Sequence, residues 1–120
     1  MTGKKLLLVE DDPKSLFAIR ALLEAHGFDV LACGSAEDAI ARMDGEGDLS
    51  CAVIDLRLPR MQGPELGHAL RQRHPAIQLI FTTAFDGSVR AREEFPDAHV
   101  LVKPLDVQAL LKHIDGEENT

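Results

Sequence analysis

The stretch that decides the fold is LLLVEDDP, residues 6–13, in which four apolar residues run directly into three acids and a proline. Consecutive apolar residues without alternation are typical of a strand buried on both faces, as in a parallel sheet. Asp12 is a favourable helix N-cap, and Pro13 fits the first helical position. The stretch therefore predicts a strand that ends at the acids and leads directly into a helix.

The rest of the chain repeats this alternation of strand and helix. Gly27 ends the helix that begins at Pro13. Further short apolar runs predict strands at 28–33, 51–54, 77–82 and 99–102. Amphipathic spacing predicts helices at 36–43, 64–73, 86–95 and 106–114. Because βαβ crossovers are right-handed, this order predicts an α/β protein with a doubly wound, five-stranded parallel sheet.

The composition is that of one globular domain. The chain has 120 residues, of which 45% are apolar, and we expect a single domain over 1–120, structured over about 4–115 with a polar tail at 116–120. Its net charge of −7 argues against binding to nucleic acid or to an anionic membrane. No apolar run approaches the ~20 residues of a membrane span, and no secretory signal is recognisable. We therefore expect a cytoplasmic protein with Cys33 and Cys51 as reduced thiols.

Polar residues follow four of the five predicted strands. These residues are Glu10 and Asp11, then Asp55, Thr83 and Lys103. Each of them alone is more often a turn or cap residue than a functional one. Because the carboxyl ends of parallel strands form one edge, where such folds bind ligands, the set predicts a functional site there.

The charges of this set indicate a metal. Glu10, Asp11 and Asp55 bring three negative charges to one place, and Lys103 returns only one positive charge. The simpler alternative is a pair of salt bridges around Lys103, but one lysine cannot balance three carboxylates. Mg²⁺ would neutralise the remaining charge, since it binds one or two carboxylates and keeps waters for a phosphate.

A divalent cation beside a carboxylate, a hydroxyl and a lysine is typical of phosphoryl transfer, and a carboxylate can form an aspartyl phosphate. Asp55 is the best candidate nucleophile because it is the lone acid at the end of a central strand. Asp11 would hold the metal, and Glu10 would bind it directly or through water. Thr83 and Lys103 would contact the phosphoryl oxygens.

Four motifs together resemble the response regulator receiver domain, the CheY-like family. They are VEDDP at 9–13, DLRLPRMQG at 55–63, Thr-Ala at 83–84 and Lys-Pro at 103–104. The likeness covers essentially the whole chain in the order of the family. It implies a flavodoxin-like fold with strand order 2-1-3-4-5.

The resemblance also implies the function and the site. A sensor histidine kinase or histidine phosphotransfer protein would donate a phosphoryl group to Asp55 with Mg²⁺ as cofactor. The backbone carbonyl of Arg57 would be a further metal ligand beside Glu10, Asp11 and Asp55. Thr83 with Ala84 would form the switch, and Lys103 would pair with the phosphoryl group. The domain would be a signalling module and no enzyme beyond its own phosphorylation and dephosphorylation.

Three further positions match structural features of the family. Pro59 and Gly63 correspond to the residues that shape the loop after the phosphorylated aspartate. Pro104 would follow a cis peptide bond. Arg57 and Phe85 occupy places that influence how fast the acyl phosphate hydrolyses in this family.

The sequence departs from the family at the readout. Three residues before the lysine, the family usually has a tyrosine or phenylalanine whose ring turns inward when the threonine moves to the phosphate. This chain has Val100 there, beside His99, and it has no tyrosine. The segment from Thr83 to Lys103 is also about two residues short. The helix at 86–95, the strand at 99–102 and the helix at 106–114 correspond to the family's output and dimer face, so the readout is expected to be non-standard. The output partner would be a fused or separate effector.

Two other functions are compatible with part of this pattern. A Mg²⁺-dependent phosphatase with an aspartyl nucleophile commonly carries a second aspartate two residues on, where this chain has Arg57. A phosphate-independent interaction module on the same fold is the other alternative, and Val100 keeps it open.

Overall fold

The predicted first strand lies inside a parallel sheet of five strands. The computed structural model describes residues 4–84 and 89–115. The strands are β1 (Lys5–Val9), β2 (Asp29–Cys33), β3 (Cys51–Asp55), β4 (Gln78–Thr83) and β5 (His99–Val102). Their order is β2-β1-β3-β4-β5, and every pairing is parallel. The predicted doubly wound sheet and its strand order are confirmed.

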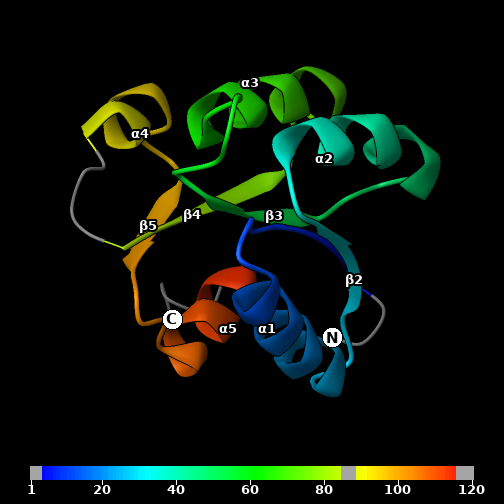
Figure 1. Cartoon of the computed structure of the whole chain (residues 1–120). Helices are drawn as coiled ribbons and strands as arrows, with labels where there is room; N and C mark the ends of the chain where they lie inside the picture. Colours follow the sequence, from blue (N-terminus) through cyan, green and yellow to red (C-terminus); the bar gives the residue numbers. More distant parts are fainter. Residues whose placement is uncertain (1–3, 85–88, 116–120) are drawn as a thin grey trace.

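The helices cover both faces of the sheet. Figure 1 shows α1 (Pro13–Ala25) and α5 (Val107–Asp115) on one face, and α2 (Ala36–Met43), α3 (Gly63–Arg73) and α4 (Val89–Glu94) on the other. A short 3₁₀ helix, η1 (Asp44–Glu46), follows α2. Within the described ranges, no helix has the length and apolar character needed to cross a membrane.

The chain packs two hydrophobic layers because successive strand residues point to opposite faces of the sheet. In β1, Leu7 and Val9 belong to the cluster under α2 and α3, whereas Leu6 and Leu8 belong to the cluster under α1 and α5. All four are at most 1% exposed. An apolar run without alternation is thus required here, because both faces of the strand are covered.

The helix starts follow the local sequence. The Asp12 side chain accepts a hydrogen bond from the Ser15 amide at 3.2 Å, and Pro13 opens α1. The start of α3 has a capping box in which the Gln62 amide donates to Glu65 Oε1 at 2.9 Å. These two caps fix where α1 begins after Glu10 and Asp11 and where α3 begins after Asp55.

The fourth helix ends one residue earlier than predicted. The prediction was 86–95, and the described helix runs over Val89–Glu94, while residues 86–88 lie outside the described residues. Its C-terminal end is explained by Pro96, because the residue before a proline is disfavoured in the helical conformation. Phe95 therefore leaves the helix, and its side chain is 4% exposed in the core.

Candidate functional site

Three carboxylates meet at the carboxyl edge of the central strands. Glu10 and Asp11 follow β1, and Asp55 is the last residue of β3. One oxygen from each lies within 4.8 Å of the others. Glu10 is 2% and Asp55 6% exposed, whereas Asp11 is on the surface. The structure thus brings together the three acids that the sequence predicted as one group.

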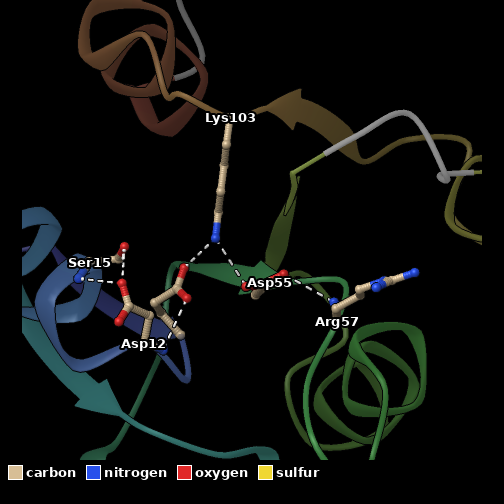
Figure 2. A network of polar contacts seen from close by, with 6 residues as sticks. Asp12, Ser15, Asp55, Arg57 and Lys103 are labelled. Carbon is tan, nitrogen blue, oxygen red and sulfur yellow. Dashed lines mark hydrogen bonds and ion pairs between the residues drawn. The ribbon is translucent and has the colours of Figure 1, made fainter.

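Lys103, which follows β5, reaches across to two of these acids, as Figure 2 shows. Its Nζ lies 2.7 Å from Glu10 Oε1 and 3.1 Å from Asp55 Oδ2. The salt bridges that were the simpler alternative therefore exist. They pair Lys103 with Glu10 and Asp55, and the three acids and the lysine together still carry a formal charge of minus two when all are ionised.

The electrostatics of Glu10 and Lys103 are tied to their burial. Desolvation raises the pKa of Glu10, and the hydrogen bond from Lys103 opposes that rise without cancelling it. Desolvation by itself lowers the pKa of Lys103, but its hydrogen bonds to Glu10 and Asp55 outweigh this, so the pKa is raised. Lys103 is thus held as a cation between the two buried carboxyl groups.

Backbone amides hold both buried carboxylates in place. The Arg57 amide donates to Asp55 Oδ1 at 3.0 Å, and the Asp12 amide donates to Glu10 Oε2 at 3.2 Å. In Figure 2 the side chain of Arg57 leads away from Asp55 and Lys103. The sequence did not predict these amide contacts, because residue types do not show where a loop amide points. They leave each carboxylate with one oxygen toward Lys103.

The loop after Asp55 passes very close to the start of α3. A Cβ on Gly63 would lie 2.8 Å from the carbonyl oxygen of Asp55 and 2.9 Å from the Leu56 Cα, both backbone atoms. The Gly63 amide donates to the Leu56 carbonyl at 3.1 Å. Pro59 is exposed in this loop, and its carbonyl accepts from the Met61 amide at 2.7 Å. A residue without a Cβ is therefore required at position 63, because the backbone of Asp55 and Leu56 lies so close.

The remaining predicted residues lie on the β4 and β5 side. Thr83 ends β4 and is 3% exposed, and its carbonyl accepts from the Lys103 amide at 2.7 Å. Ala84 is exposed next to it. The peptide bond between Lys103 and Pro104 is cis. Phe85 lies outside the described residues.

Val100 and its neighbour His99 face opposite sides of the sheet. Val100 is partly buried and packs against the hydrophobic cluster under α2 and α3. The ring of His99 stacks on that of His113 in α5, with centroids 3.9 Å apart and planes 23° apart. His99 is therefore directed to the other layer of the fold, and it does not take the place of an aromatic ring at position 100.

A small cavity opens on the α4 side of the acidic residues. It has a volume of about 190 Å³, and its walls are Leu56, Arg57, Gln62, Pro64, Thr83, Arg90 and Ala91. Leu56 directly follows Asp55, and Asp55 pairs with Thr82 in the sheet, next to Thr83. Arg90 was not predicted as a site residue. A surface arginine on a charged helix has no sequence signal that would distinguish it.

The donor set fits a hard divalent cation. All three acids offer carboxylate oxygens, which are the ligands that Mg²⁺ takes together with water. Asp11 is exposed and so leaves an approach for a hydrated ion, while Glu10 and Asp55 are buried behind it. The excess negative charge gives a reason for such an ion to bind.

A doubly wound sheet with paired acids, a lone aspartate, a threonine and a lysine at successive strand ends defines a class of signalling domain. The profile of the response regulator receiver domain matches residues 6–115. The chain belongs to the response regulator receiver domain family, as its four motifs predicted.

Relatives occur among both regulators and sensors. The chain is 35% identical over 109 residues to the response regulator protein FleR of Pseudomonas aeruginosa, a match that covers 89% of this chain and 23% of FleR. It is 28% identical over 112 residues to the sensor protein TorS of Escherichia coli, covering 92% of this chain and 12% of TorS. The chain thus spans under a quarter of these two proteins.

A solved structure shows the same fold. The response regulator protein TrrA from Thermotoga maritima, in complex with Mg²⁺ and BeF, superposes with a TM-score of 0.83. The match covers 95% of this chain and 98% of TrrA at 20% sequence identity. At that identity the likeness supports the fold.

Proposed function

We propose that this receiver accepts a phosphoryl group on Asp55 from the phosphohistidine of a sensor histidine kinase or a histidine phosphotransfer protein. The observation that carries the proposal is the position of Asp55. It lies at the end of β3, within 4.8 Å of the carboxylate oxygens of Glu10 and Asp11 and 3.1 Å from the ammonium of Lys103. Membership in a family of phosphoacceptors and the presence of relatives among sensor proteins support it.

In the transfer, a carboxylate oxygen of Asp55 attacks phosphorus, and the bond between phosphorus and the donor's imidazole nitrogen breaks with its electron pair returning to nitrogen. The Arg57 amide holds Asp55 Oδ1 at 3.0 Å and so orients the carboxylate before the attack. Lys103 Nζ, which now bridges Glu10 and Asp55, would pair with a phosphoryl oxygen. The hydroxyl of Thr83 and the amide of Ala84 would bind further phosphoryl oxygens.

We propose Mg²⁺ as the cofactor, held by Asp11, Asp55, Glu10 and the backbone carbonyl of Arg57. When bound, it would offset the negative charge that gathers on the phosphoryl oxygens. The three clustered carboxylates support this assignment, and so does the fold shared with TrrA, a regulator solved with Mg²⁺ and BeF. Pro59, Gly63 and Pro104 would shape the loops around this site.

We further propose that the chain acts as one cytoplasmic receiver domain over about residues 4–115. Its output would pass through the face formed by α4, β5 and α5 to a fused or separate effector, and a homodimer could form there. Val100 in place of an aromatic ring supports a readout that does not depend on a rotating ring at that position. Direct contact with nucleic acid is not part of the proposal, given the net charge of −7.

The test is phosphorylation with acetyl phosphate and Mg²⁺, followed by intact-protein mass spectrometry. We expect one phosphoryl group on the wild type and none on Asp55→Ala. Asp12→Asn is the matched control and should be phosphorylated like the wild type, because Asp12 caps α1 and asparagine caps equally well. A phosphorylated form that persists in Asp55→Ala would overturn the assignment. Absence of phosphorylation in the wild type would favour the phosphate-independent module.

A further inference from the structure

The cavity beside the acidic site has arginines on two of its walls. Arg57 comes from the loop after β3 and Arg90 from the first turn of α4, and Thr83 at the end of β4 lines the same cavity. A volume of about 190 Å³ is well above what one water requires, so a small oxyanion fits. Guanidinium groups bind phosphoryl oxygens through paired hydrogen bonds, so the two arginines make this cavity suited to an anion.

Arg90 is held by a weak partner. Its Nε donates to Glu94 Oε2 at 2.8 Å, an i,i+4 pair whose side chains are 50% and 34% exposed. Exposed pairs of this kind contribute little, and the order with the cation N-terminal to the acid is the less favourable one in a helix. Arg90 can therefore exchange Glu94 for a more strongly charged partner at small cost.

Glu94 would keep a partner after such an exchange. Its Oε1 lies 2.7 Å from His68 Nε2 of α3, and hydrogen bonds from His68 first and Arg90 second lower the pKa of Glu94. The ring of His68 also packs on Phe95, with centroids 4.5 Å apart. Phe95 in turn packs on Phe81 of β4 at 5.4 Å. The pair of Arg90 and Glu94 thus belongs to a contact chain that joins α4, α3 and the sheet.

We propose that Arg90 is an additional phosphoryl-binding residue, whose guanidinium leaves Glu94 and binds the phosphoryl group of Asp55 through this cavity. This inference rests on the proposed phosphorylation of Asp55. A phosphoryl group carries up to two negative charges and three acceptor oxygens, so it attracts a guanidinium more strongly than one exposed carboxylate does. Phosphorylation would then act on α4 directly, through the charge that attracts Arg90. This mechanism needs no aromatic ring at the position of Val100.

The experiment uses beryllofluoride with Mg²⁺ as the phosphoryl mimic. Because the chain has no tryptophan and no tyrosine, binding is followed by NMR of backbone amides, the Arg90 Nε–H and the His68 ring. In the wild type we expect the Arg90 and His68 signals to shift together on binding. Arg90→Gln should bind the mimic about fivefold more weakly. Arg92→Gln, on the same helix but outside the cavity wall, should match the wild type.

A second variant separates ligand binding from helix stability. Glu94→Gln breaks the same ion pair but leaves Arg90 available, so it should bind the mimic as tightly as the wild type or about twofold more tightly. If the pair mattered only for the stability of α4, both substitutions would weaken binding alike, and that result would overturn the inference. Equal affinity of Arg90→Gln and Arg92→Gln would overturn it too. Failure of the wild type to bind the mimic would instead count against the phosphorylation of Asp55.

Discussion

The centre of the sheet and its β5 edge are built differently. All five residues of β3 are buried, as are four of the five in β1, and both strands have neighbours on each side. In β5 three residues are partly buried, and Val102 is 48% exposed. The neighbouring α4 has six residues. The acids thus lie at the ends of strands that are almost fully buried, whereas the proposed output face includes a partly exposed edge strand.

Lys103 connects these two regions. It follows the β5 edge, yet its ammonium lies between Glu10 and Asp55 at the ends of the central strands. If Lys103 changed its partner, we would therefore expect β5 to shift before β1 and β3, because the two central strands are buried and have little freedom to move. This difference between centre and edge can be tested by substitutions matched in chemistry.

The largest expected effect is on the core of the centre. Leu7→Ala in β1, at a position with no exposure, should lower the free energy of unfolding by about 2–5 kcal/mol. Val102→Ala in β5 should change it by less than about 0.5 kcal/mol. Urea unfolding followed by circular dichroism measures both. Equal costs at the two positions would remove the distinction between centre and edge.

Gly63 tests how tightly the loop after Asp55 is packed on the central strand. Gly63→Ala should cost about 1–3 kcal/mol, because its Cβ would meet the backbone of Asp55 and Leu56. Gly34→Ala is the control, since a Cβ there has no neighbour within 4 Å. Thermal unfolding of both variants gives the comparison. A neutral Gly63→Ala would mean that the loop can shift and that it is not tightly packed on the central strand.

Mg²⁺ should stabilise the centre selectively. At a hundred times its dissociation constant, a ligand that binds the folded state alone adds about 2.7 kcal/mol, and the shift at lower concentrations is smaller. We expect Asp11→Asn to lose most of this gain and Asp12→Asn to keep it. Thermal unfolding with and without Mg²⁺ measures the shift, and hydrogen exchange should locate the added protection at the ends of β1 and β3. A shift of the same size in both variants would refute the metal assignment.

The last comparison concerns an ion pair between α3 and the turn before β5. Arg71 Nη2 lies 2.8 Å from Asp97 Oδ2, and this hydrogen bond lowers the pKa of Asp97. A lowered folded-state pKa contributes stability above the unfolded pKa and loses it as the pH falls through the folded value. Asp97 is 62% exposed, so Asp97→Asn should cost at most about 1 kcal/mol at neutral pH.

The same difference should shrink as the pH falls below about 4, where aspartate begins to protonate. Asp44→Asn serves as the control, because its contact with Arg73 is 3.7 Å long and both side chains are well exposed. Unfolding curves at several pH values measure the trend. A cost that stays constant into acid would show that Asp97 acts by something other than its charge.

The sequence predicted the sheet and the acidic group for the same physical reason. A strand covered on both faces needs an uninterrupted apolar run, so its ends are visible where polar residues begin, as at Glu10 and Asp55. Once the strands are parallel, their carboxyl ends must share an edge, and Lys103 falls there too. Residue order was therefore enough to group residues that lie far apart in the chain.

Other features depended on distances that no residue pattern encodes. The amide of Arg57 on Asp55 is set by the course of a loop, and the tight approach of Gly63 by how α3 packs on that loop. The position of Arg90 on the cavity wall follows from the placement of a six-residue helix. Such details arise from tertiary packing, which composition and periodicity do not determine.

The central claim, that Asp55 is the residue that receives the phosphoryl group, is tested most directly by locating the modification. The protein is phosphorylated with acetyl phosphate and Mg²⁺ and reduced with borohydride, which converts an aspartyl phosphate to homoserine, and its peptides are then sequenced by mass spectrometry. We expect homoserine at position 55 and unmodified aspartate at Asp11 and Asp12. Homoserine at either of those positions, or none at 55 in a protein that has taken up phosphate, would contradict it.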